Sequence, residues 1–376
     1  MAKKIILYCI LLSLLFFASP GSAREEAVIT SESAVLMDKD SGRVLYARNP
    51  HVRRPIASIT KIMTGILALE LGNLDDVVVV SPLAAVVEGS SIWLEEGEEK
   101  TLEELVYGLM LRSGNDAASA IAEHIAGSVE NFALLMNQRA RQLGAHNTRF
   151  KNPHGLHHDE HYSTAYDMAV IARHALGIAK FQEIIATPEV KITWPGHEWS
   201  RVLRNQNRLL DLYEGGDGIK TGWTTPAGRC FVGSATREGW QLITVVLNAP
   251  SMWEDAMSLL DLGFDQYQRH TLAREGAFVR QVPLEGGVRE NLRVKAAEGF
   301  SLALKEEEEA LLRLDLNLVD GLRAPVTEGQ LVGVLDVRIG EEPVGSILLR
   351  AAEDMPRANF FHALQSFFAR FFSFRS

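Results

Sequence analysis

The segment RPIASITKIMT, residues 54–64, is the stretch around which the rest of the chain can be interpreted. Pro55 leads into a predicted helix that begins near Ser58, and Lys61 follows three positions later. Residues three apart share one helix face, with Cβ atoms roughly 5–6 Å apart, so the Lys61 amine can reach the Ser58 hydroxyl. Apolar residues surround most of this predicted helix, which favours a buried position: Ile59, Ile62, Met63, Ile66, Leu67 and Leu69.

This Ser-Lys pair admits a chemical and a purely structural interpretation. A serine hydroxyl becomes a good nucleophile when a nearby base takes its proton. Lysine can act as that base if burial and a second cation lower its pKa. The same pattern also fits a Ser58 N-cap followed by an exposed lysine. A lysine is, however, unfavourable at the positive end of a helix dipole, so Lys61 needs another explanation.

Composition and the N-terminus indicate an exported protein. The chain has 376 residues, of which 47% are hydrophobic, enough for one large or two ordinary domains. A net charge of −10 argues against general nucleic-acid binding. Residues 1–23 are predicted to be a signal peptide, with Lys3 and Lys4 before an apolar run and cleavage after Ala23. An uncleaved anchor is the alternative. Cys230 is then the single cysteine of the mature chain, which excludes an internal disulfide and fits a bacterial envelope protein.

The order of predicted elements indicates an α+β fold for residues 24–274. Two strands come first, several helices follow, and strands with a closing helix end the segment, which predicts an antiparallel sheet flanked by helices with its first and last strands adjacent. Strands are predicted at 33–37, 44–47, 77–80, 190–194, 218–222, 229–236 and 241–248. Helices are predicted at 102–111, 117–126, 129–143, 163–175 with Ser163 as cap, and 251–268.

The pattern changes near residue 275. Short alternating runs at 292–294, 311–318, 331–337 and 344–349 predict a small all-β domain over residues 275–352. Residues 353–376 are predicted to form an amphipathic helix, because phenylalanines from Phe360 to Phe372 fall on one face and no acid follows Asp354. We expect residues 357–376 to attach the protein peripherally to a membrane surface. Docking of this helix on the protein's own surface is the alternative.

Two further motifs follow the Ser-x-x-Lys motif in sequence. The segment RSGND, residues 112–116, lies between two predicted helices, and its glycine allows Ser113 and Asn115 to face the same space. The segment GIKTG, residues 218–222, begins a predicted strand, where Gly222 leaves room for a substrate backbone. Ser-x-x-Lys, Ser-x-Asn and Lys-Thr-Gly in this order form a motif set of penicillin-binding proteins and class A β-lactamases.

The chain resembles the low-molecular-weight penicillin-binding proteins that act as serine-type D-alanyl-D-alanine carboxypeptidases. Segments at 150–155, 162–167 and 324–326 and the amphipathic tail extend this resemblance over nearly the whole chain. It implies a serine transpeptidase-like domain, a β-rich domain and a membrane-attached terminus on the outer face of the cytoplasmic membrane. The implied substrates are peptidoglycan stem peptides ending in D-Ala-D-Ala, and β-lactam antibiotics are implied ligands.

The resemblance also implies a role for each motif residue. Ser58 is the expected nucleophile, Lys61 its base, and Ser113 the group that relays a proton to the leaving D-alanine. Expected substrate-binding residues are Asn115, Lys220, Thr221, Gly222 and Trp223, with the N–H groups of Ser58 and Trp223 as the oxyanion hole. No cofactor or metal is expected for this reaction.

Two other functions remain open on the sequence. A β-lactamase is one, although Gly114 replaces the aspartate of that motif and no Glu-x-x-x-Asn segment lies between residues 116 and 220. A non-catalytic penicillin-binding wall sensor is the other. Arg208 is not assigned to the substrate carboxylate, although it is near the third motif. The four histidines from His154 to His161 lack the spacing of a helical zinc pair, and the acids from Glu95 to Glu99 are predicted to be solvated.

Overall fold

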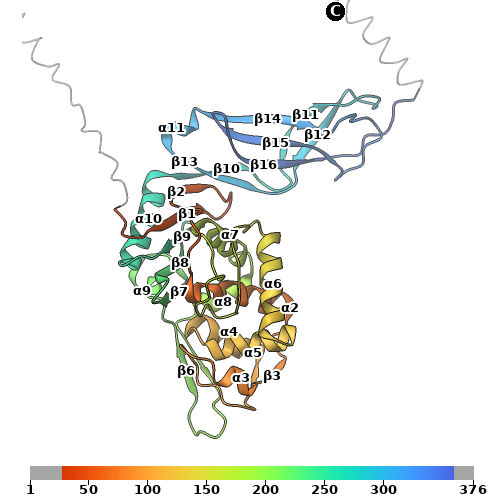
Figure 1. Ribbon diagram of the computed structural model, residues 1–376. Helices are drawn as coiled ribbons and strands as arrows, with labels where there is room; N and C mark the ends of the chain where they lie inside the picture. Colours follow the sequence, from red (N-terminus) through yellow and green to blue (C-terminus); the bar gives the residue numbers. More distant parts are fainter. Residues whose placement is uncertain (1–27, 360–376) are drawn as a thin grey trace, which may run out of the picture.

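The computed structural model describes residues 28–359, and the predicted signal peptide and most of the predicted C-terminal helix lie outside this range. Figure 1 shows two parts, a mixed α/β domain and an elongated β-rich domain packed across one end of it. No helix among the described residues combines the length and the apolar character needed to cross a lipid bilayer.

A five-stranded antiparallel sheet forms the centre of the first domain. Its spatial order is β2 (Val44–Arg48), β1 (Ser33–Asp38), β9 (Trp240–Leu247), β8 (Gly228–Arg237) and β7 (Gly216–Thr224). The first strand of the domain therefore lies beside its last strand, β1 against β9, as predicted. Alternate residues of these strands point to opposite faces, so both faces of the sheet are apolar and both are covered.

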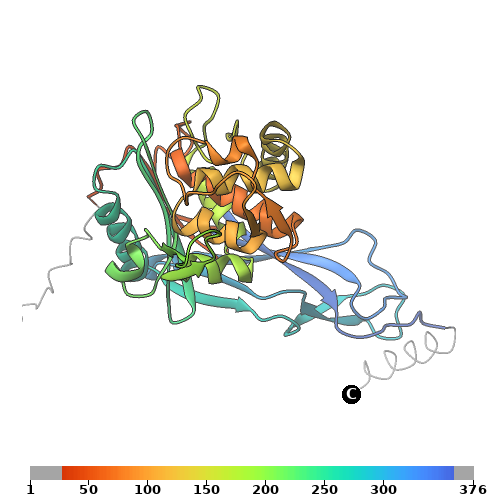
Figure 2. The ribbon, with the colours of Figure 1, turned by 90° about the horizontal axis from the view of Figure 1, so that it is seen from below.

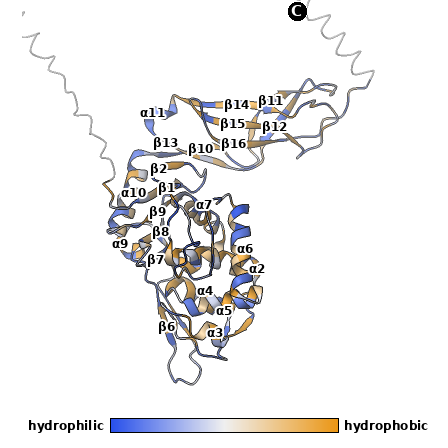
Figure 3. Cartoon of the chain, viewed as in Figure 1, coloured by the Kyte–Doolittle hydropathy of each residue, from blue (hydrophilic) through white to orange (hydrophobic). Residues whose placement is uncertain are grey.

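Helices on the two faces of the sheet make two separate cores. One face packs against a cluster made of α2 (Lys61–Leu71), α4 (Leu102–Leu111), α5 (Asn115–Ala126), α6 (Val129–Gln142), α7 (Ala165–Ala175) and α8 (Ala179–Ala186). The other face packs against α10 (Met252–Gln266) and the short α9 (Leu209–Leu212). Figure 2 shows α10 and the helix cluster on opposite sides of the strands, and Figure 3 shows hydrophilic residues on the outer helix α6.

The helix α2 lies in the middle of its cluster, as its apolar sequence predicts. Eight consecutive residues from Lys61 to Ala68 are buried. A short 3₁₀ turn, η1 (Ala57–Thr60), precedes α2 and places Ser58 at the edge of the sheet beside β7. Small elements complete the domain: α3 (Pro82–Ala85), the pair β3 (Val77–Val79) and β4 (Glu99–Thr101), and the pair β5 (Glu189–Ile192) and β6 (Arg201–Arg204).

The second domain consists of two antiparallel sheets around its own core. The larger sheet has the order β11 (Phe278–Pro283), β12 (Asn291–Ala296), β16 (Glu342–Ala351), β15 (Leu331–Ile339) and β14 (Leu312–Leu318). In the smaller sheet, β10 (Gln268–Ala273) pairs with β13 (Phe300–Leu304). The strand pairing of this domain therefore begins before residue 275, where the sequence pattern placed its start. A short helix, α11 (Glu306–Glu309), follows β13.

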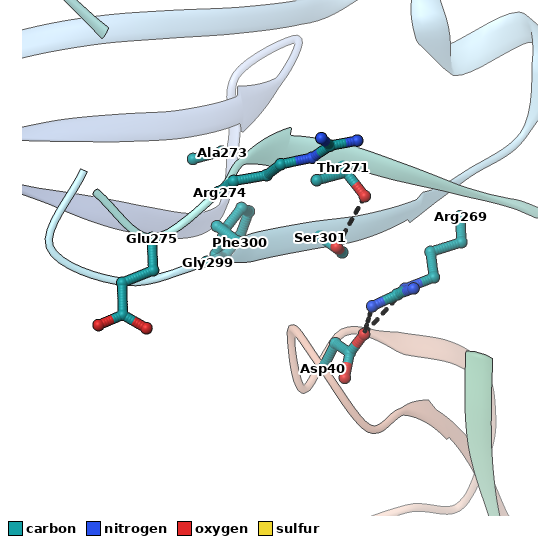
Figure 4. Close-up of a pocket in the computed structure, with 9 residues that line it drawn as sticks. All are labelled: Asp40, Arg269, Thr271, Ala273, Arg274, Glu275, Gly299, Phe300 and Ser301. Atoms are coloured by element: carbon teal, nitrogen blue, oxygen red, sulfur yellow. Dashed lines mark hydrogen bonds and ion pairs between the residues drawn. The ribbon is translucent and has the colours of Figure 1, made fainter. Parts of the chain in front are cut away.

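Charged side chains join the two domains. Arg43 donates to both carboxylate oxygens of Glu308 at 2.9 and 2.5 Å, so this acidic residue of α11 is paired across the boundary between the domains. Arg269 forms an ion pair with Asp40 at 2.7 Å, and Figure 4 shows this pair among the residues that line a cavity, most of which come from β10, β13 and the turns next to them. Ion pairs at the turn that joins β1 to β2 thus contribute to the domain contact, together with Ala303 of β13, which packs in the apolar cluster beside β2.

Two local predictions are wrong, for physical reasons. The helix α7 is capped by Thr164, whose hydroxyl accepts the N–H of Asp167, whereas the backbone of Ser163 pairs with Arg54. Glu98 is buried rather than solvated, because Arg201 and Lys100 form ion pairs with it at 2.8 and 3.1 Å. In both cases the deciding partner is distant in sequence.

Candidate active site

Ser58 lies in a strained turn that neighbouring segments hold in place. Ala57 before it has a φ of 48°, a left-handed conformation that costs roughly 1–3 kcal/mol in a residue other than glycine. Gly155 packs directly against this turn, since a Cβ on Gly155 would lie 2.0 Å from the Ala57 carbonyl oxygen. The loop 150–155, conspicuous in the sequence, therefore supports the turn that carries the serine.

The Lys61 amine contacts three oxygens from three parts of the domain. Lys61 Nζ lies 3.1 Å from Ser58 Oγ, 2.7 Å from Asn115 Oδ1 and 2.7 Å from the His154 carbonyl oxygen. The amide and carbonyl oxygens can only accept hydrogen bonds. A neutral amine has two N–H groups, which satisfy these two acceptors and leave its lone pair for the Ser58 hydroxyl. The Ser58 O–H then donates to Lys61, which is the arrangement that a general base requires.

Electrostatics favour the neutral form of this amine. Lys61 is completely buried, and burial is the main cause that places its pKa well below the ordinary value. The positive charge of Lys220 lowers the pKa of Lys61 further, and Asp116 acts in the opposite direction. The sequence-based requirement of burial and a second cation is therefore met.

The second motif joins α4 to α5 and is fixed by the loop at residues 88–94. Ser113 is buried and left-handed, with a φ of 63°. The Asn115 N–H donates to the Ser90 carbonyl at 2.7 Å, and its side-chain Nδ2 donates to the Glu88 carbonyl at 2.5 Å. These bonds orient the amide so that its oxygen faces Lys61.

The third motif lies on β7, next to the turn that carries the serine. Lys220 is buried, and burial lowers its pKa to about 7. Its Nζ donates to the Thr221 carbonyl at 3.1 Å. A Cβ on Gly222 would lie 2.9 Å from the Ser58 backbone nitrogen, so only glycine permits this close approach of strand and turn.

All eight predicted site residues lie together in and behind one cavity of about 290 Å³. Ser58, Ser113, Thr221, Gly222 and Trp223 line it, and Trp223 is 64% exposed at its rim. Lys61, Asn115 and Lys220 are buried, and hydrogen bonds tie Lys61 to Ser58 and Asn115. The geometry provides a nucleophile, a base, a second cation and a hydroxyl around one space.

Sequence reasoning missed several residues of this cavity. The remaining lining residues are Ser90, Gln206, Arg229, Met252 and Trp253. Arg229 pairs across the β7–β8 hairpin with Trp223, a register that the turn residues at 225–228 could have indicated. Arg208, by contrast, is exposed at the start of α9 and does not line the cavity.

The histidine loop contributes backbone and packing beside the lysine. His154 and His161 are buried, and burial is the main cause that lowers the pKa of each to about 3, so both are neutral. The His161 ring is 2.8 Å from the Thr60 hydroxyl. Within residues 28–359, no group of three or more His, Cys, Asp or Glu side chains is arranged to hold a metal ion. Cys230 is buried, which raises the pKa of its thiol to about 11, as expected for a packed and unreactive thiol.

Comparison with known proteins covers both domains. Residues 21–251 match the family model described as D-alanyl-D-alanine carboxypeptidase, and residues 267–357 match the C-terminal domain of penicillin-binding protein 5. The chain is 37% identical to D-alanyl-D-alanine carboxypeptidase DacF of Bacillus subtilis, over 92% of this chain and 93% of that protein. It is 33% identical to DacD of Escherichia coli, over 90% of each.

A solved structure gives the same result for the fold. Penicillin-binding protein 5 of Haemophilus influenzae aligns with a TM-score of 0.77 at 29% identity, over 89% of this chain and 99% of that one. The α+β fold with a sheet-rich second domain is thereby confirmed. Because the family model spans more than half of the sequence and the relatives match along nearly its whole length, this chain belongs to the serine-type D-alanyl-D-alanine carboxypeptidases, the low-molecular-weight penicillin-binding proteins.

Proposed function

We propose that Ser58 is the nucleophile with which this D-alanyl-D-alanine carboxypeptidase removes the terminal D-alanine from peptidoglycan stem peptides. The observation that carries the assignment is the environment of Lys61. Two obligate acceptors use both N–H groups of the neutral amine, and the third contact, at 3.1 Å, is the Ser58 hydroxyl. Proton transfer from Ser58 to Lys61 accompanies attack on the carbonyl between the two D-alanines.

The tetrahedral intermediate needs hydrogen-bond donors for its oxyanion. The N–H groups of Ser58 and Trp223 are proposed for this role, and the tight packing of Gly222 against the Ser58 nitrogen supports it. One such donor is typically worth about 3–4 kcal/mol of transition-state stabilisation. Ser113 lines the same cavity and is proposed to pass the proton on to the nitrogen of the leaving D-alanine. Water then releases the shortened peptide from Ser58.

The terminal carboxylate of the substrate needs a positive environment. Lys220 and Thr221 are proposed to face it, as the motif implies. Arg229 adds an exposed guanidinium at the rim of the same cavity, where it pairs across the hairpin with Trp223. We therefore assign carboxylate recognition to Arg229 together with Lys220, and not to Arg208.

Penicillins acylate the same serine, because members of this family bind β-lactams. The β-lactamase and the non-catalytic sensor are disfavoured, since the curated relatives are named as carboxypeptidases over nearly the full length of the chain. Slow release of a penicillin adduct separates a carboxypeptidase from a β-lactamase, and release of D-alanine separates it from a sensor.

The test combines labelling and turnover. A fluorescent penicillin should label one tryptic peptide, the one that contains Ser58, and a peptide ending in D-Ala-D-Ala should yield free D-alanine. Ser58→Ala should abolish both signals, and Lys61→Ala should nearly abolish both. Lys151→Ala is a matched control, because this lysine lies on the neighbouring loop, is partly exposed and pairs with Glu160. Label on another residue, or an active Lys61→Ala variant, contradicts the assignment.

We also propose that the protein is exported and attached to the outer face of the cytoplasmic membrane. The basic and apolar pattern of residues 1–23 supports export, and the one-sided phenylalanines of residues 357–376 support peripheral attachment. Removal of residues 357–376 should move the protein from the membrane fraction to the soluble fraction without loss of D-alanine release. Persistence in the membrane fraction contradicts the anchor.

A further inference from the structure

Two loops of the catalytic domain present aromatic rings to solvent. Trp93, between α3 and β4, is 59% exposed, and Trp199, between β5 and β6, is 63% exposed. The ring of His197 connects Trp199 to Trp194, with centroids 5.2 and 4.4 Å apart. We call these four residues the aromatic surface. Figure 1 shows the β5–β6 hairpin projecting from the end of the domain that lies away from the β-rich domain.

One buried arginine holds the two loops together. Arg201 Nη2 donates to the Trp93 carbonyl oxygen at 2.7 Å, and its guanidinium carbon lies 4.6 Å from the centroid of the Trp194 ring. The same guanidinium binds the buried Glu98 at 2.8 Å. Burial of such a charged group is costly unless its geometry is well satisfied. The contacts of Arg201 therefore position the Trp93 backbone relative to the Trp194 ring.

The first loop leads from the wall of the active site to the aromatic surface. Ser90 lines the catalytic cavity, three residues before Trp93. Asp116 holds the intervening backbone, since its carboxylate accepts the N–H groups of Ile92 and Leu94 at 3.0 and 3.1 Å. The cavity wall and the exposed Trp93 thus belong to the same loop.

We propose that the aromatic surface binds the glycan strand that carries the stem peptide, an inference that rests on the proposed function. A stem peptide in the cavity advances ~3.3–3.6 Å per extended residue, so its sugar end lies outside the cavity. Pyranose rings have apolar C–H faces that stack on indole rings, and hydroxyl edges that donate hydrogen bonds.

The charges around the aromatic surface fit a neutral sugar better than an anionic lipid. Glu95, Glu96 and Glu198 are exposed beside it, and Glu95 already accepts from the Trp194 indole at 3.4 Å. Carboxylates accept hydrogen bonds from sugar hydroxyls and repel lipid phosphates. A bilayer surface is therefore the disfavoured occupant.

Binding is tested with insoluble strands of chitin, an uncharged polymer of N-acetylglucosamine, because glycan strands stripped of their peptides by an amidase would carry free carboxylates. The full-length Ser58→Ala variant should sediment with these strands, and additional Trp199→Ala or Trp93→Ala substitutions should weaken sedimentation. Trp199→Phe should retain most of it, because a phenyl ring can also stack. Leu134→Ala is the control, since Leu134 is 67% exposed but lies on α6. Vesicles containing anionic phospholipid are the competing probe.

Turnover provides a second measurement on the active enzyme. Trp199→Ala should leave kcat/KM unchanged on a free peptide ending in D-Ala-D-Ala. On the same peptide attached to an oligosaccharide, kcat/KM should fall roughly three- to tenfold, the range for loss of one aromatic contact. The proposal is overturned if Trp199→Ala changes kcat/KM equally on both substrates or if the protein does not sediment with the glycan. It is also overturned if Trp199 is needed for binding to vesicles and not to glycan. If the unmodified enzyme released no D-alanine from either substrate, the proposed function would be refuted. The sedimentation result does not depend on D-alanine release, so the two failures can be told apart.

Discussion

Glu98→Gln tests whether the catalytic domain depends on a buried ion cluster that joins its two aromatic loops. The substitution keeps the shape of the side chain and removes one negative charge. Glu98 Oε1 lies 2.8 Å from Arg201 Nη1 and 3.1 Å from Lys100 Nζ. The side chains of all three residues are at most 3% exposed. After the substitution, two buried cations face each other without a neutralising charge.

The size of the effect follows from this burial. Removal of one partner from a buried ion pair typically costs about 3–5 kcal/mol. Lys100 retains its hydrogen bond to Thr193, and Arg201 retains the Trp93 carbonyl, so we expect about 3 kcal/mol. For a domain of this size the melting temperature should fall by roughly 6–12 °C. Burial raises the pKa of Glu98, but hydrogen bonds from Arg201, from the Glu95 N–H and from Lys100 lower it below its usual value, so this stabilisation is lost as the pH falls.

The assay is urea unfolding of the full chain, followed by fluorescence of the tryptophans beside the cluster. Glu160→Gln is the matched control, because Glu160 also lies between an arginine and a lysine, at 2.7 Å from Arg149 and 3.3 Å from Lys151. That carboxylate is 48% exposed, and the control should cost less than about 1 kcal/mol. Equal losses in the two variants would show that burial does not set the energy of the cluster and would refute the reasoning.

Three further predictions concern the active site. The value of kcat/KM should fall at acid pH as Lys61 becomes protonated. Lys220→Gln removes a neighbouring positive charge and so raises the pKa of Lys61, which should move the acid limb of the pH–rate profile to higher pH. Arg229→Ala should raise KM roughly tenfold for a peptide with a free carboxylate, while the corresponding carboxamide should show no such change in steady-state kinetics. His154 and His161 have pKa values of about 3 in the folded state, below the ordinary 6.5. Their contribution to the free energy of unfolding should therefore be constant above pH 6.5 and fall below it, by about 2 kcal/mol for each histidine at pH 5; a denaturant midpoint unchanged between pH 7 and pH 5 would contradict this.

Local sequence patterns predicted the features that depend on neighbouring residues. The spacing of Ser58 and Lys61 predicted their contact, because one helical turn brings positions i and i+3 together. The helix Leu102–Leu111 was predicted with its observed ends, since Glu103 and Glu104 mark its first turn and Gly114 interrupts the helical pattern after it. The adjacency of the first and last strands of the sheet followed from the order of elements.

Features set by distant partners were not predictable in this way. Glu98 was interpreted as solvated, because no residue near it in sequence indicates its partner Arg201, which is 103 positions away. Arg229 was missed because its place at the cavity depends on the register of the β7–β8 hairpin. The cap of α7 was assigned one residue early, since Ser163 and Thr164 are both good caps and pairing of Ser163 with Arg54 decides between them.

The protonation state of Lys61 shows why the motif spacing alone does not make an active site. The three oxygens around Nζ would satisfy a charged ammonium as well as a neutral amine, because an ammonium could donate to all of them. Burial against the sheet and the charge of Lys220 favour the neutral form. Those two influences come from the packing of α2 into the core and from β7, which lies more than 150 residues further along the chain. The basicity that the reaction needs is therefore a property of the folded domain, and a short helix containing only Ser-x-x-Lys would keep its lysine charged.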